Sequence, residues 1–66
     1  MQSKLLTLRD VEAATTLGRS RIYQLIAEKA FPSPIKVSPG RSAWLAAEVD
    51  TWIEARIALR DGGEAK

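Results

Sequence analysis

The chain has 66 residues, with ten Lys or Arg and eight Asp or Glu, so its formal net charge is +2. This length fits one domain near the lower limit at which a hydrophobic core can stabilise a fold. The sequence has no cysteine and no histidine, which excludes a disulfide framework and a thiolate metal site and removes the commonest general base. We therefore expect a single domain over residues 1–66 that uses no cofactor or metal and is not an enzyme.

No stretch of the sequence has the length of a membrane span. The longest apolar run, residues 43–47, is far shorter than the roughly 20 residues that cross a bilayer. Residues 1–6 look like a short lead-in and lack the apolar core of a signal peptide. These features predict a soluble, cytoplasmic protein.

The charges are unevenly distributed along the chain. Residues 1–47 carry seven Lys or Arg and three Asp or Glu, a balance of +4, whereas residues 48–66 carry three and five, a balance of −2. The basic part indicates a surface that faces a polyanion, although a solvated charged face gives the same pattern.

The first predicted helix covers about residues 7–15. Thr7 and Asp10 resemble a capping box in which Asp replaces the usual Glu. A tight turn over residues 16–18 follows, with Leu17 expected to point inward. A second helix directly after this turn would complete a helix-turn-helix.

The second predicted helix, over about residues 19–29, carries charges that oppose its dipole. Its apolar stripe consists of Ile22, Leu25 and Ile26. Gly18 is a tolerable N-cap, so Arg19 and Arg21 fall in the first turn, where the dipole disfavours each cation by roughly 0.3–1 kcal/mol. The same helix end attracts anions, so the arginines favour contact with a phosphate or a guanine edge. Ordinary solubilising charges are the alternative.

Two prolines, Pro32 and Pro34, are expected to end this helix. Alternating residues then predict a hairpin, or wing, over about residues 35–45, with a turn at residues 38–41. A lone hairpin is marginally stable in water, so its apolar side chains should pack on the helices. These side chains are Ile35, Val37 and Trp44.

The last predicted helix covers about residues 48–60, and Gly62 and Gly63 are its expected stop. Its apolar stripe consists of Val49, Trp52, Ile53 and Ile57. Trp44 and Trp52 are interpreted as core residues, with base stacking as the alternative. The acidic residues of this helix could imitate a catalytic cluster, but helix-dipole complementarity explains the first two, and the chain has no nucleophile paired with a base.

Four segments together carry a family resemblance: LGRSRIYQLI, FPSPIKV, GRSAW and EVDTWIEAR. Their order and spacing, over roughly residues 5–60, resemble the AlpA-type prophage regulatory proteins, small relatives of phage excisionases with a MerR-like winged helix-turn-helix. The resemblance implies a mainly α fold with a small β-hairpin, in the order α-α-β-β-α, and sequence-specific DNA binding. Family members usually carry serine at position 18 and a capping residue at position 47, so Gly18 and Ala47 should weaken both helix starts.

The resemblance also implies which residues contact DNA. The second helix becomes the recognition helix, and residues 36–42 become a wing that reaches a neighbouring groove or the backbone. The recognition-helix candidates are Arg19, Ser20, Arg21, Tyr23 and Gln24. The wing candidates are Lys36, Ser38, Arg41 and Ser42. Gln24 could read adenine, Arg41 could enter a minor groove, and Tyr23 either flanks the core or contacts a phosphate.

These residues predict a sequence-specific, double-stranded DNA-binding regulator of a prophage or integrated element. It would act as a transcriptional regulator, as an excisionase-like recombination directionality factor, or as both. A small protein-interaction module without DNA binding, such as an antitoxin-like or adaptor domain, is the alternative. A domain this small contacts few base pairs, so we expect repeated sites, self-association on DNA, and an integrase or RNA polymerase as possible partners.

Overall fold

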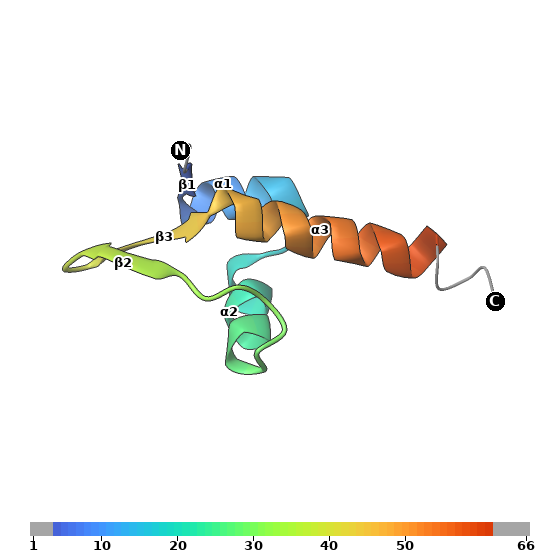
Figure 1. Cartoon of the computed structure of the whole chain (residues 1–66). Helices are drawn as coiled ribbons and strands as arrows, with labels where there is room; N and C mark the ends of the chain where they lie inside the picture. The colour runs from blue at the N-terminus through green and yellow to red at the C-terminus, as the bar shows by residue number, and fades with distance from the viewer. Residues whose placement is uncertain (1–3, 62–66) are drawn as a thin grey trace.

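The computed structural model describes residues 4–61. In chain order the elements are β1 (Leu5–Leu6), α1 (Leu8–Thr15), α2 (Arg19–Ala27), β2 (Ile35–Ser38), β3 (Arg41–Leu45) and α3 (Ala46–Asp61). In Figure 1, α1 lies partly behind α3, α2 lies below them, and the β2–β3 hairpin projects to one side. This arrangement confirms the predicted winged helix-turn-helix, mainly helical with a small hairpin.

The start of α1 is the predicted capping box. The Asp10 N–H donates to Thr7 Oγ1, and the Thr7 N–H donates to Asp10 Oδ2, both at 3.1 Å. Thr16 ends the helix in the left-handed conformation, with φ 63°, while its N–H bonds to the Glu12 carbonyl. Leu17 then packs against the core, as expected, so the turn into α2 is short and anchored.

Helix α2 starts where predicted but ends at Ala27 rather than near residue 29. The left-handed conformation of Lys29, with φ 61°, reverses the chain before either proline is reached. The Lys29 N–H bonds to the Ile26 carbonyl at 2.9 Å, and the Ala30 N–H bonds to the Leu25 carbonyl at 2.8 Å. This pair of bonds is a Schellman motif, which satisfies the carbonyl groups at the helix end.

The sheet has three strands in the order β1-β3-β2, and its first strand was not predicted. Leu5 and Leu6 pair antiparallel with Leu45 and Trp44, so these two residues of the segment expected to be a short lead-in form a strand. The Ala46 N–H donates to the Lys4 carbonyl at 2.8 Å, directly beyond the last strand pair. Helix α3 begins at Ala46 instead of near residue 48, and the Lys4 carbonyl is the acceptor for its first N–H group.

The expectation that Ile35 and Val37 pack on the helices is wrong. Their fractional exposures are 39% and 48%. Both belong to β2, which is an edge strand paired only with β3, and the hairpin projects away from the helices in Figure 1. The hairpin is anchored instead through β3, whose residues Ala43 and Trp44 are buried.

The core lies where the three helices meet β3. Its buried members are Val11, Ile22, Phe31, Trp44 and Val49. Trp44 Nε1 donates to the Pro32 carbonyl at 3.0 Å, and Trp52 Nε1 donates to the Ala30 carbonyl at 2.7 Å. Phe31 meets the Trp52 ring edge to face, with 4.9 Å between centroids. These contacts confirm both tryptophans as core or core-flanking residues that hold the segment between α2 and β2.

The predicted apolar stripe of α3 is only partly buried. Val49 is buried, and Trp52 and Ile53 pack against the core, but Ile57 is 47% exposed. The C-terminal half of α3 extends past the other elements in Figure 1, so this part of the helix has less of the fold to pack against. The predicted stop at residues 62–63 lies outside the described residues. None of the helices within residues 4–61 combines the length and the hydropathy of a membrane span.

Candidate nucleic-acid interface

Helix α2 separates an apolar face from a polar face. Ile22 is buried, while Leu25 and Ile26 pack against the core from the same side. The five recognition-helix candidates all remain exposed. They are Arg19, Ser20, Arg21, Tyr23 and Gln24. Helical spacing therefore brings these side chains together on the surface of one element.

The N-terminus of α2 combines uncapped backbone donors with two arginines. Gly18 occupies the N-cap position, and no side chain accepts a hydrogen bond from the first turn. The first N–H groups of a helix have no partner within the helix, and they favour an anion. Arg19 and Arg21 stand in this turn, which contains no acidic residue. This end of α2 therefore carries a positive charge that favours a bound anion.

The arginines of this surface are not neutralised by carboxylates within the described chain. Among residues 4–61, the ion pair within 4 Å joins Arg60 and Asp61 at the far end of α3. The hydrogen bond that Arg60 Nε donates to Asp61 raises the pKa of the Arg60 guanidinium. The charges of Arg19, Arg21 and Arg41 remain available to an external anion.

Three exposed side chains form a hydrogen-bonded row along α2. Arg21 Nη1 donates to Gln24 Oε1 at 3.0 Å, and Gln24 Nε2 donates to Glu28 Oε2 at 3.4 Å. Glu28 was not among the residues singled out from the sequence. Its spacing of four residues from Gln24 is the signal that could have identified it, since such positions are neighbours on a helix surface.

Tyr23 lies between the core and the exposed face. Its ring meets the Trp44 ring edge to face, with 6.3 Å between centroids, and its fractional exposure is 41%. Trp44 belongs to β3, so this contact links the recognition helix to the wing. The position of Tyr23 fits the reading in which it flanks the core.

The wing candidates occupy adjacent positions of the β2–β3 hairpin. Lys36 is paired with Ser42, and Ser38 is paired with Arg41, with an irregularity between Lys36 and Ser38. All four are exposed. The turn between the strands contains Gly40 at φ 80°, a conformation that glycine adopts without strain. The hairpin therefore presents two hydroxyls and two cations close to its turn.

The recognition-helix and wing candidates form two separate groups. Within residues 4–61, no hydrogen bond joins a candidate on α2 to a candidate on the wing. The two groups are connected through the core contact of Tyr23 with Trp44. In Figure 1, α2 and the hairpin extend from the helical body as distinct projections.

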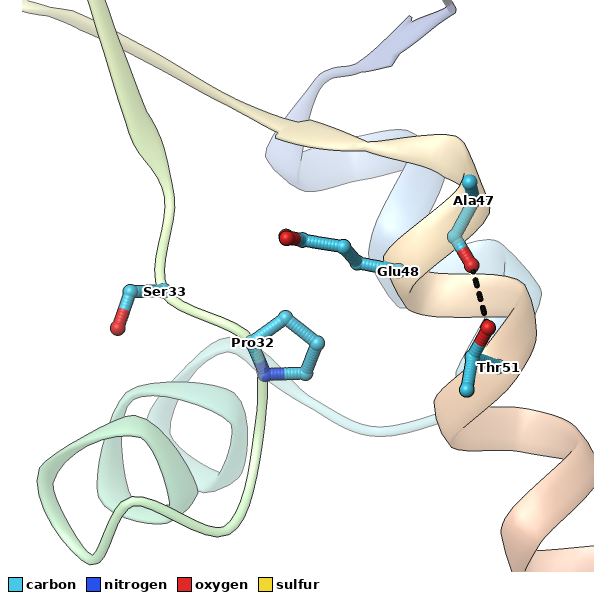
Figure 2. A pocket seen from close by; sticks show the side chains of 5 residues that line it. All are labelled: Pro32, Ser33, Ala47, Glu48 and Thr51. Carbon is cyan, nitrogen blue, oxygen red and sulfur yellow. Dashed lines mark hydrogen bonds between the residues drawn. The ribbon is translucent and has the colours of Figure 1, made fainter.

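Two shallow hollows flank these elements. The larger, of about 510 Å³, lies between Pro32–Ser33 and the first turns of α3, and Figure 2 shows the Glu48 side chain extending into it. Thr51 Oγ1 is already bonded to the Ala47 carbonyl at 2.9 Å. The second, of about 400 Å³, lies between β1 and the wing and is lined partly by Arg41 and Ser42. The part of the chain that the structure describes contains no group of three or more metal-ligating side chains.

Comparison with known proteins identifies the family. The family described as "Prophage CP4-57 regulatory protein (AlpA)" matches residues 4–57. The chain belongs to the AlpA family. This prophage regulatory family is a DNA-binding, non-enzyme family.

A phage protein supports the same assignment. The protein named "Uncharacterized protein ORF88" of Enterobacteria phage P4 is 37% identical over 62 residues, which cover 94% of this chain and 70% of the phage protein. No solved structure matches the chain significantly. The AlpA match spans α1, α2, the wing and most of α3, so it includes every candidate DNA-contacting residue.

Proposed function

We propose that this AlpA-family protein is a sequence-specific regulator that binds double-stranded DNA of a prophage or integrated element as a single domain. In this proposal α2 enters the major groove, and its exposed side chains contact base edges and phosphates. The wing contacts the backbone or the adjacent minor groove through Lys36, Ser38, Arg41 and Ser42.

The observation that carries the proposal is the first turn of α2. Arg19 and Arg21 are exposed, have no acidic partner within residues 4–61, and stand at an uncapped helix N-terminus. In the free protein this arrangement is disfavoured by the helix dipole. A bound phosphate or guanine edge would reverse that penalty, because it would accept hydrogen bonds from both the arginines and the backbone N–H groups.

The regulatory role has two forms, transcriptional control and excisionase-like direction of recombination. In both, a domain with a short footprint would gain affinity by binding repeated sites, with self-association on the DNA. An RNA polymerase would be the partner in the first form and an integrase in the second. All of these partners belong in the cytoplasm, together with the DNA.

The first experiment is to identify the bound sequence. The full chain is used to select duplexes from a randomised pool, and the selected motif is then footprinted on the promoters and attachment sites that flank its gene. We expect one enriched motif that occurs more than once in the protected region. Equal retention of all duplexes would contradict sequence-specific binding.

A second experiment separates the two regulatory forms. A promoter reporter and an integrase-dependent excision assay are run with the parent protein and with the Arg19→Ala variant. A change in reporter output alone assigns a transcriptional role, a change in excision alone assigns a directionality role, and a change in both assigns both roles. If the variant loses either effect, that effect requires the Arg19 side chain of α2. A protein that binds its motif but alters neither output would contradict a regulatory function at these sites.

A further inference from the structure

Both ends of α2 carry charges that the helix dipole disfavours. DNA binding explains only the arginines at the N-terminal end. Glu28 is the C-cap residue of α2, and the last turn of the helix contains no basic residue. A carboxylate at this position is disfavoured by the negative end of the helix dipole. Glu28 also lies on the helix proposed to face a polyanion, where it would repel phosphates. A specific contact is therefore needed to explain it.

The contact is the hydrogen-bonded row that Glu28 ends. A carboxylate can only accept hydrogen bonds, and a guanidinium can only donate them. With Glu28 at one side and Arg21 at the other, the Gln24 amide satisfies both only when its nitrogen faces Glu28 and its oxygen faces Arg21. The observed donors and acceptors, at 3.4 Å and 3.0 Å, have this orientation.

The row holds Arg21 without neutralising it. Gln24 separates the two charges by a neutral amide, and the pair Arg21 and Glu28 is not within ion-pair distance. Only Nη1 of Arg21 donates within the row. The guanidinium has five N–H donors in a planar fork, so the edge formed by Nε and Nη2 remains free for a bidentate contact with guanine.

We propose that Glu28 is a positioning residue for base recognition: it fixes the Gln24 amide, which in turn fixes the orientation of the Arg21 guanidinium toward DNA. This inference rests on the proposed function. It assigns a role in specificity to a residue that itself repels the nucleic acid. Glu28 acts through Gln24 and makes no base contact of its own.

The test compares Glu28→Gln with Glu54→Gln in the full chain. Both variants remove one negative charge, but Glu54 is an exposed residue of α3 that takes no part in the row. A glutamine at position 28 can present either an oxygen or a nitrogen to Gln24, so it no longer selects one amide orientation. Affinity is measured on the duplex selected from the randomised pool and on a scrambled duplex of the same composition.

We expect the selected-to-scrambled affinity ratio of Glu28→Gln to fall about five- to tenfold, part of the discrimination that one bidentate contact supplies. Glu54→Gln should leave the ratio unchanged. If Glu28→Gln raises both affinities equally and keeps the ratio, Glu28 is only a repulsive surface charge and the proposal is overturned.

A double-mutant cycle tests whether Glu28 acts through Gln24. In a Gln24→Ala background, Glu28→Gln should no longer change the affinity ratio, because the intermediate amide is absent. A further fall of the same size in that background would mean that Glu28 contacts the DNA directly, which contradicts a positioning role.

One readout is independent of DNA. In the free protein, Glu28→Gln should shift the side-chain amide resonance of Gln24, and Glu54→Gln should not. An unshifted Gln24 resonance would mean that Glu28 does not contact Gln24, and this result would overturn the proposal. If Glu28→Gln shifts the Gln24 resonance but the parent protein binds all duplexes equally, the proposed function is overturned and the side-chain contact is still supported.

Discussion

Trp44 connects the wing to the recognition helix through one fully buried side chain. Its indole N–H bonds to the Pro32 carbonyl, and its ring meets Tyr23 of α2. The side chain therefore fills the core and satisfies a backbone acceptor in the segment that leads into the wing. A buried indole whose N–H has a partner contributes packing without an unsatisfied donor.

Replacing this side chain should unfold much of the population. Trp44→Ala is expected to lower the free energy of unfolding by about 3–5 kcal/mol, a large fraction of the roughly 5–15 kcal/mol of a typical domain. Urea unfolding followed by circular dichroism measures the change. Val37→Ala, at an exposed position of the same hairpin, is the control and should change stability by no more than about 0.5 kcal/mol. Equal unfolding midpoints for Trp44→Ala and the parent would refute its structural role.

Arg21 is the residue on which base recognition is expected to depend most. If it makes a bidentate contact with guanine, Arg21→Ala should lose roughly 1–3 kcal/mol on the selected duplex and little on a scrambled one. The melting temperature should not change, because the side chain is exposed. Fluorescence anisotropy on the two duplexes gives both affinities.

The matched control for Arg21→Ala is Arg9→Ala, which removes one exposed positive charge from α1. It should weaken binding to both duplexes alike, if at all, because phosphate contacts carry no direct sequence information. A selected-to-scrambled ratio that stays at the parent value in Arg21→Ala would exclude Arg21 from base recognition.

At the scale of elements, the wing should contribute affinity rather than specificity. Arg41 lies beside the hairpin turn and pairs across the strands with Ser38, where it can reach a phosphate. Arg41→Ala should weaken binding to selected and scrambled duplexes by the same factor and reduce the salt slope by about one. Unchanged affinity on both duplexes would mean that the wing has no role in binding through this residue.

The elements with local sequence signals were predictable. The capping box of Thr7 and Asp10 identifies the start of α1, and the Pro-Gly turn identifies the hairpin. Features that depend on tertiary contacts were not predictable. The strand β1 is two residues long and exists through its pairing with β3, and α3 starts two residues early because the Ala46 N–H finds an acceptor in Lys4.

The candidate site was also predictable only where local sequence signals determine it. Helical spacing was enough to place the recognition-helix candidates on one exposed face of α2. The expectation that Val37 packs on the helices was wrong, because a sequence pattern does not reveal whether a strand lies at the edge of a sheet. The row that ends in Glu28 was not predictable from charge, because an acidic residue on a face that attracts DNA has a role there only through its neighbours.

At the scale of the whole molecule, the charge is divided along the chain. The balance of +4 over residues 1–47 includes the helix-turn-helix and the wing, whereas residues 48–66 have a balance of −2. We expect this division to orient the protein on DNA, with its basic elements toward the phosphates and most of α3 away from them. Binding should therefore release counterions mainly from the contacts of α2 and the wing.

We expect α2 and the wing to bind duplex DNA with sequence preference, and a salt titration on two duplexes measures this binding. With about five phosphate contacts, a plot of log affinity against log salt should have a slope of roughly −4 to −5 on both duplexes. At physiological salt the selected duplex should bind at least about 10³-fold more tightly than the scrambled one. A flat salt dependence would contradict electrostatic DNA binding, and equal affinity for the two duplexes throughout the titration would contradict sequence preference.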